Sequence, residues 1–223
     1  MSPSHVLPSL VTRTYMSLMI SVLVLTSLGF SPPNEEGIWE RRLREDGKMN
    51  LPVEPTLQLK VTSCGPAVIA MAYRYAYPET KITEQMIITY ASKKGYYTES
   101  KFPFTSPEHM LAIAQHYVDT TSTGRVSTLE EGLSLLIDTL TGGDPVIIDI
   151  LARLDDPDSG AHFVVVTGVT IDNNPNKTKI HFNDPLTGTN RWGYWLGGSG
   201  VWNAWKNNGD PGGSGWWMVI SSP

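Results

Sequence analysis

The sequence contains a single cysteine, Cys64, among its 223 residues. One cysteine can form neither an intramolecular disulfide framework nor a thiolate zinc site. The chain also has no excess of basic residues, since its formal net charge is −5 and no stripe of lysine or arginine occurs. Nucleic acid is therefore not an expected partner. Low-complexity tracts and internal repeats are absent too, and the length suffices for one domain with a sizeable core.

No apolar run reaches the roughly 20 residues that a membrane-spanning helix needs. The longest, residues 15–30, is interrupted by serine and threonine and follows a stretch that has no acidic residue and carries Arg13. We expect residues 1–30 to be a signal peptide, with Ser27-Leu28-Gly29 or Gly29-Phe30-Ser31 as a small-x-small cleavage site. An uncleaved membrane anchor is the alternative. The protein is then secreted or extracytoplasmic, with transient membrane association through this segment, or membrane-anchored if cleavage does not occur.

After residue 30, hydrophobic periodicity and turn residues indicate a polar linker followed by a domain whose first part is helical and whose second part consists of strands. Residues 31–50 are polar and charged, which predicts a linker with a short helix at residues 39–44, so the domain proper is expected to cover residues 51–223. Helices are predicted first, with capping signals and glycine or proline at their ends, over residues 64–77, 83–94, 106–117 and 127–141. Strands rich in β-branched and aromatic residues follow, over residues 145–151, 162–169, 179–183, 192–196 and 216–220. Helices followed by strands, without βαβ alternation, predict an α+β fold with an antiparallel sheet.

Cys64 stands where a loop is predicted to turn into a helix. Pro66 in the first turn is compatible with that start, and Thr62 or Ser63 could cap the free amides. The positive end of the helix dipole would then favour the thiolate form of Cys64. A lone cysteine is more often an inert core residue, but an unpaired thiol in an exported protein is a candidate reactive group.

A base for this thiol can be sought on the predicted sheet. The turn Asp172-Asn173-Asn174-Pro175-Asn176 joins two strands as a hairpin. Folding the chain about its centre places His162 opposite Asp184, close enough for the carboxylate to accept a hydrogen bond from the imidazole. His181 then points to the other face of the sheet and is expected to be structural. His109 and His116 share one face of a predicted helix and are expected to be solvated rather than metal ligands.

These pieces together resemble the papain-like double-glycine peptidases, which process bacteriocin leaders, and their standalone exported relatives. The resemblance covers residues 51–185. It is carried by Leu51-Pro52-Val53, Gln58, Ser63-Cys64-Gly65-Pro66-Ala67, Gly143-Asp144-Pro145-Val146, Ala161-His162-Phe163-Val164-Val165-Val166-Thr167-Gly168 and Asn183-Asp184-Pro185. It implies a papain-like α+β fold in which an N-terminal helical half carrying the nucleophile packs on the antiparallel sheet.

The resemblance also implies a role for each matching residue, and no cofactor or metal. Cys64 would be the nucleophile, His162 the general base and then acid, and Asp184 the residue that orients the imidazole. The side-chain amide of Gln58 would form the oxyanion hole with the backbone N–H of Cys64. Gly65 would let a substrate backbone come close; the alternative is that it merely allows a tight helix start.

The function expected from this set is an exported cysteine peptidase, which hydrolyses peptide bonds of a peptide or protein substrate through a thioester acyl-enzyme. A peptidoglycan amidase or a transpeptidase of the same fold is an alternative, and a non-catalytic binding module is another. Specificity for double-glycine leaders is not implied, because nothing here resembles the transporter to which the leader-processing members are fused.

Beyond Pro185 a tail holds six of the seven tryptophans. Trp192 is a candidate for a substrate groove, whereas burial in the core is the favoured explanation for the group.

Overall fold

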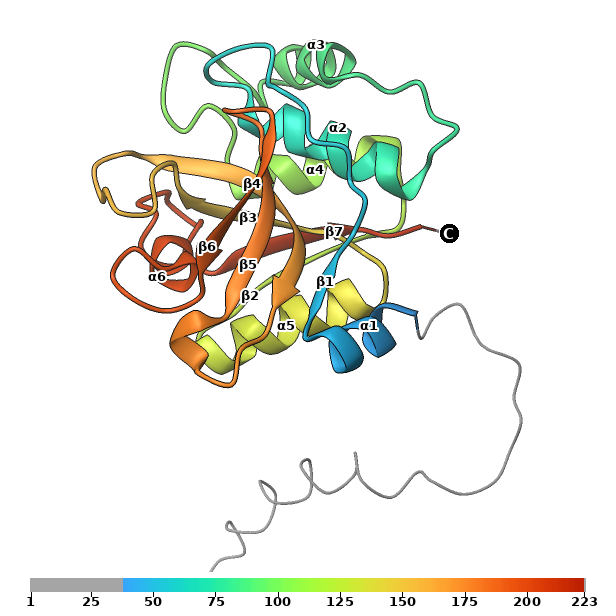
Figure 1. Cartoon of the computed structure of the whole chain (residues 1–223). Coiled ribbons are helices and arrows are strands. Elements are labelled where there is room, and N and C mark those ends of the chain that lie inside the picture. Colours follow the sequence, from blue (N-terminus) through green and yellow to red (C-terminus); the bar gives the residue numbers. More distant parts are fainter. Residues whose placement is uncertain (1–37, 223) are drawn as a thin grey trace, which may run out of the picture. The chain divides into compact units, whose positions relative to one another are not determined.

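The computed structural model describes residues 38–222 (Figure 1). The expected export signal and the first part of the expected linker lie outside the described residues. Within the described range, no helix is both long and apolar enough to cross a membrane. The helices are α1 (Ile38–Asp46), α2 (Cys64–Ala76), α3 (Glu84–Lys94), α4 (Pro107–Tyr117), α5 (Leu129–Thr141) and α6 (Val201–Lys206), with a short 3₁₀ turn at Pro175–Lys177. The strands are β1 (Lys48–Asn50), β2 (Thr121–Arg125), β3 (Val146–Leu151), β4 (Ala161–Thr170), β5 (Lys179–Asp184), β6 (Thr189–Tyr194) and β7 (Trp216–Ile220).

The strands form one seven-stranded antiparallel sheet. Its order is β2-β7-β3-β4-β5-β6, and β1 pairs with β4 at the side of this path. The helices α2, α3 and α4 contact one another on one side of the strands, while α1 lies against α5 on the other, as Figure 1 shows. This arrangement confirms the expected α+β fold.

Helix α2 is the centre of the core. Its residues from Gly65 to Ala72 are all buried, and Val68, Ile69 and Met71 expose at most 1% of their surface. Burying an aliphatic side chain of this size contributes about 1.5–3 kcal/mol. A helix enclosed in this way cannot shift easily, so the position of its first residue, Cys64, is well defined.

Local capping signals set the ends of two further helices as expected. Thr83 accepts a hydrogen bond from the backbone N–H of Met86 at the start of α3, and Gly95 ends that helix in the left-handed conformation with φ 74°. Ser106 caps α4 through the N–H of His109. Helix α5 was expected to begin at residue 127 but begins at Leu129, after a capping box. There Thr128 and Glu131 bond each other's backbone N–H groups.

Several elements differ from the prediction. In the segment expected to be a linker, the short helix expected at residues 39–44 is present as α1. Strand β1 was not expected there, and it completes the sheet by pairing with β4. The strand expected at residues 192–196 runs from Thr189 to Tyr194, because polar residues suit an exposed edge of the sheet and Trp195 turns into the core, where 1% of it is exposed. Strand β2 and helix α6 were not predicted.

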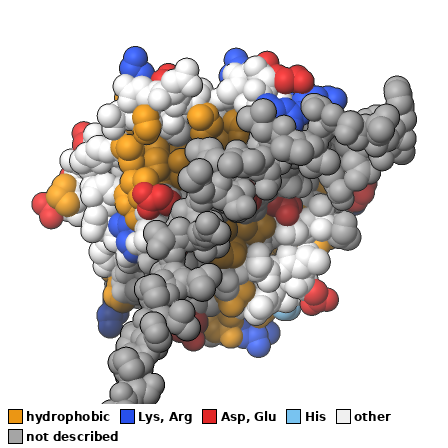
Figure 2. Space-filling view, turned by 90° about the horizontal axis from the view of Figure 1, so that it is seen from below, with side chains coloured by type: hydrophobic (Ala, Val, Ile, Leu, Met, Phe, Trp, Pro, Cys, Tyr) orange, Lys and Arg blue, Asp and Glu red, His pale blue; other side chains and the backbone are white. Residues whose placement is uncertain are grey.

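Figure 2 shows a face on which hydrophobic side chains form a band with acidic and basic ones scattered around it.

Candidate active site

Cys64 is the first residue of α2, and the residue as a whole is partly exposed. The expectation that Thr62 or Ser63 caps this helix through its side chain is wrong. Ser63 occupies the cap position, but its hydroxyl donates hydrogen bonds to Glu84 and to the Lys60 carbonyl and accepts none from the helix amides. The backbone N–H groups of Gly65 and Phe163 point to the sulfur and favour its anionic form. Cys64 therefore rests between the open start of its helix and the beginning of strand β4.

His162 and Asp184 are buried next to this thiol. The Nε2 atom of His162 lies 2.8 Å from Oδ1 of Asp184, and their side chains expose 6% and 2% of their surface. The same carboxylate accepts a hydrogen bond from the backbone N–H of Leu186 at 2.9 Å, and Nη1 of Arg191 donates to its Oδ2 at 2.6 Å. Both carboxylate oxygens are thus occupied, and the imidazole is held by one nitrogen while the other is left for the thiol.

A β-bulge brings His162 and Asp184 to the same face of the sheet. Near the turn, the register of β4 and β5 pairs Thr170 with Lys179, and continuing it would place Asp184 opposite Val165. His162 would then point to the other face. The register shifts at Thr167, between Val166 and Gly168, so that Asp184 faces the position of Val164, two residues from His162. The predicted direct pairing of His162 with Asp184 is therefore wrong by two residues, and the contact is diagonal.

The electrostatics of the three side chains favour a charged pair. Burial raises the pKa of the Cys64 thiol, but the hydrogen bond with His162 and the charge of that ring outweigh it, so the pKa is lowered overall. Burial lowers the pKa of His162, but its hydrogen bonds with Asp184 and Cys64 dominate and raise it to about 9. For Asp184, burial raises the pKa, and the bonds with His162 and Arg191 more than reverse this. A thiolate facing an imidazolium is the form these shifts stabilise at neutral pH.

Gln58 belongs to the loop that leads to Cys64. Its side chain is 9% exposed, and its Nε2 donates to the carbonyls of Lys60 at 2.6 Å and of Val61 at 2.8 Å. The Oε1 atom is buried and has no partner among the described residues. Both amide hydrogens are thus engaged with the loop. The Lys60 carbonyl also accepts the backbone N–H of Ser63 at 3.0 Å, so it would keep a donor if Gln58 turned away.

Neither of the two residues expected to contact substrate offers a side-chain surface beside the thiol. Gly65 is buried, and a Cβ atom there would come within 2.8 Å of Met110 Sδ and 3.3 Å of Thr105, so a larger residue would force these neighbours to shift. Trp192 is 49% exposed on β6, where it pairs with His181. Its neighbour Arg191 reaches Asp184, and successive strand residues point to opposite faces, so Trp192 projects from the other face. Burial does account for Trp195, Trp205 and Trp216, none of which is more than 4% exposed.

Sequence reasoning missed Arg191 and a buried acidic pair. Arg191 pairs with Phe182, two residues before Asp184, so only the β5–β6 register could have revealed its contact. Asp149 is fully buried on β3 beside Phe163, and neither of its carboxylate oxygens has a hydrogen-bond donor within residues 38–222. Burial and the neighbouring Asp210 raise the pKa of Asp149 well above its ordinary value, and burial raises that of Asp210 to about 6. We expect the two carboxyl groups to share a proton.

Among the described residues, no group of three or more His, Cys, Asp or Glu side chains could hold a metal ion.

Comparisons with known proteins identify a family for this chain. Residues 50–210 match the Peptidase C39 like family, which is more than half of the chain. No curated protein matches the sequence. Among solved structures, the chain is similar to the crystal structure of the peptidase domain of Streptococcus ComA, described as a bi-functional ABC transporter involved in a quorum sensing pathway. The identity is 12% and the TM-score 0.48, over 76% of this chain and 99% of that one. The extent of the family match confirms the resemblance seen in the sequence: the chain belongs to the Peptidase C39 like family.

Proposed function

We propose that the protein is a cysteine peptidase in which Cys64 is the nucleophile, His162 the general base and acid, and Asp184 the residue that orients the imidazole. The observation that carries this proposal is one chain of contacts. The thiol of Cys64, at the start of a helix, is hydrogen-bonded to the imidazole of His162. The Nε2 atom of that ring lies 2.8 Å from the buried carboxylate of Asp184. This is the nucleophile–base–orienting-group geometry of acyl transfer.

The reaction then has two steps. The Cys64 thiolate attacks the carbonyl carbon of a peptide bond, and the C–N bond breaks as the His162 imidazolium gives its proton to the leaving amine. The product is a thioester on Cys64. Water attacks this thioester while His162 takes one of its protons. The C–S bond then breaks to return the thiolate and release a carboxylic acid, which loses the remaining proton to solvent. Asp184 stays ionised throughout, because Arg191 and Leu186 hold it by hydrogen bonds.

We assign the oxyanion hole to the backbone N–H of Cys64 and the side-chain amide of Gln58. Helix N-termini leave their first amides without intrahelical acceptors, which supports the first donor. The second requires Gln58 to release one loop carbonyl. The Lys60 carbonyl can be released and still keep a donor, since Ser63 N–H also donates to it. Loss of one oxyanion donor typically lowers the rate about a hundred- to thousandfold.

The surface beside the thiol supports a peptide as substrate. Leu57, Leu59 and Val61, in the loop that ends at Cys64, expose 60%, 60% and 88% of their surface. The backbone N–H of Gln58 in the same loop donates to the carbonyl of Pro185, directly after Asp184. Exposed aliphatic side chains therefore border the proposed triad on the side of the loop, where a substrate with apolar side chains could bury them.

A cleavage assay tests the proposal. The purified chain, without residues 1–30, is incubated with a mixed-sequence peptide library and in parallel with purified peptidoglycan, and the products are identified by mass spectrometry. We expect cleaved peptides that are absent with the Cys64→Ala variant. Release of peptidoglycan fragments alone would instead identify a cell-wall amidase, and ligated products a transpeptidase. No turnover of either material, together with an unreactive thiol, would contradict the proposal and leave a binding module.

A further inference from the structure

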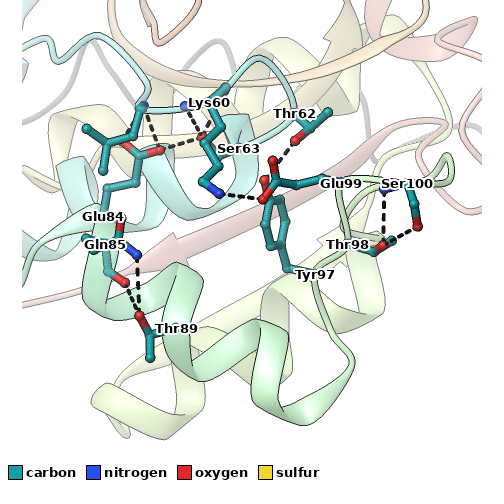
Figure 3. Close-up of polar contacts among 11 residues, drawn as sticks. Lys60, Thr62, Ser63, Glu84, Gln85, Thr89, Tyr97, Thr98, Glu99 and Ser100 are labelled. Atoms are coloured by element: carbon teal, nitrogen blue, oxygen red, sulfur yellow. Dashed lines mark hydrogen bonds and ion pairs between the residues drawn. The ribbon is translucent and has the colours of Figure 1, made fainter.

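A buried carboxylate fixes the loop that precedes Cys64. Glu84 is the first residue of α3 and is 5% exposed. Its two carboxylate oxygens accept the backbone N–H of Leu59 at 3.0 and 3.1 Å, and Oε1 also accepts the hydroxyl of Ser63 at 2.6 Å. In Figure 3 the Glu84 side chain reaches from the start of its helix to the loop that carries Lys60 and Ser63.

The loop closes on itself around this carboxylate. The backbone N–H of Lys60 donates to the hydroxyl oxygen of Ser63 at 3.0 Å, and the backbone N–H of Ser63 donates to the Lys60 carbonyl at 3.0 Å. Glu84 therefore holds both ends of the segment from Leu59 to Ser63. Gln58 precedes that segment and Cys64 follows it, so the two proposed oxyanion donors stand at the two ends that Glu84 fixes.

We infer that Glu84 is a positioning residue for the oxyanion hole, which rests on the proposed function. A carboxylate suits this task because hydrogen bonds to a charged acceptor are about twice as strong as neutral ones. Its place in the first turn of α3 adds the favourable interaction of a negative charge with the helix N-terminus. Ser63 thereby gives up capping α2, which leaves the first amides of that helix for the sulfur and for the oxyanion.

A second tether of the same loop provides a matched control. The ammonium group of Lys60 forms an ion pair with Glu99, and the side chains of this pair are 37% and 54% exposed. Exposed ion pairs contribute little to structure because solvent screens them. Glu99 thus carries the same charge and touches the same loop as Glu84, but from the outer side, and does not hold its backbone.

The test uses two probes of Cys64 that differ in one respect. Acylation by p-nitrophenyl acetate proceeds through attack on a carbonyl and builds an oxyanion, whereas alkylation by iodoacetamide displaces iodide and builds none. Both rates are measured at pH 7 for the wild type and for Glu84→Ala, Glu84→Gln, Ser63→Ala and Glu99→Gln. We expect Glu84→Ala to lower the acylation rate about tenfold or more while the alkylation rate stays within about twofold. Glu84→Gln, which keeps an acceptor of the same shape, should restore part of the loss, and Glu99→Gln should match the wild type.

The outcomes are distinct. Acylation at the wild-type rate in Glu84→Ala would overturn the inference, and so would a parallel loss of acylation and alkylation, which would mean a general disturbance of the fold. If Glu84→Ala does not fold, Glu84→Gln and Ser63→Ala decide by the same ratio of the two rates. Failure of the proposed function would appear elsewhere, as a wild-type thiol no more reactive than free cysteine toward either probe.

Discussion

His162 and Asp184 meet diagonally across strands β4 and β5, with 2.8 Å between Nε2 and Oδ1. Diagonal neighbours on two strands lie farther apart than directly opposed residues. The side chains of a histidine and an aspartate are together long enough to bridge this diagonal distance. The bond fixes which nitrogen of the ring faces Cys64. The predictions that follow concern this contact, its supports and the helix that carries the thiol.

Cys64 should alkylate at pH 7 about tenfold faster than an ordinary thiol, because its pKa is lowered by His162. The His162→Ala variant should be slower, since burial of the thiol is then opposed only by the backbone N–H groups of Gly65 and Phe163. Peptidase activity should decline as the pH rises through about 9, where the imidazolium loses the proton that the leaving amine needs. Iodoacetamide kinetics and a pH–rate profile measure both. An alkylation rate equal to that of free cysteine would contradict the expectation.

Asp184 and Arg191 should differ in their effect on activity. Asp184→Asn removes the charge that holds the imidazolium, so the alkaline limb of the pH–rate profile should move below 9 and the turnover number should fall about tenfold or more. Arg191→Ala should lower it only a few-fold, because Asp184 keeps the bonds with His162 and Leu186. Arg153→Ala is the control, since Arg153 is an exposed arginine that pairs with Asp156. Equal losses in all three variants would argue against an orienting role.

The shared proton of Asp149 and Asp210 should make stability depend on pH. The pKa of Asp210 is raised in the folded state from 3.8 to about 6, so folding favours the neutral form. The resulting stabilisation is complete below about pH 4 and is lost as the pH rises through 6. Asp210→Asn should therefore gain thermal stability relative to the wild type between pH 5 and pH 7.5. Melting temperatures at several pH values measure this, with the exposed Asp158→Asn as control. A difference that does not change with pH would contradict the shared proton.

Gly65 should be required for packing. In Gly65→Ala the new methyl group would lie 2.8 Å from Met110 Sδ, inside a buried helix, and overpacking of this kind costs about 1–3 kcal/mol. Gly198→Ala is the matched control, because no atom lies within 4 Å of its added Cβ. Chemical denaturation measures the free energy of unfolding. Unchanged stability with a raised KM for peptides would instead favour the sequence-based expectation that substrate approaches this glycine.

Residues 1–30 should direct export, and the mature chain should begin after Gly29 or Ser31. Expression of the full chain in a bacterial host, followed by N-terminal sequencing of the protein from the extracytoplasmic fraction, tests this. The matched variant replaces the apolar residue Leu23 with arginine and should keep the protein in the cytoplasm. An intact N-terminus in the membrane fraction would identify an anchor.

Local signals in the sequence predicted the local structure well. Thr83, Gly95 and Ser106 act on their own helices within a few residues, so their roles were readable from the chain alone. The three side chains of the candidate site could be named because their motif is specific. Contacts between distant segments could not be read. Glu84 bonds Leu59 across 25 positions, and this contact diverts Ser63 from its expected capping role.

The register of β4 and β5 is the clearest case. A hairpin drawn from its turn residues cannot reveal a bulge, which depends on how Thr167 is held by other segments. Its carbonyl accepts the N–H of Leu51 at 2.7 Å, and its hydroxyl accepts the side-chain amide of Asn190 at 3.1 Å. Gly168 beside it lies so close to β1 that a Cβ would meet Met49 O at 2.3 Å. Two separate segments, residues 49–51 and strand β6, thus fix a feature that the hairpin alone does not specify.

The bulge makes chain length at this point matter more than residue identity. Replacing Thr167 with another small residue changes one hydroxyl contact, whereas deleting it would turn His162 and Asp184 toward opposite sides of the sheet without altering either residue. The site should therefore tolerate replacement of Thr167 by another small residue and fail upon insertion or removal of a single residue at this point.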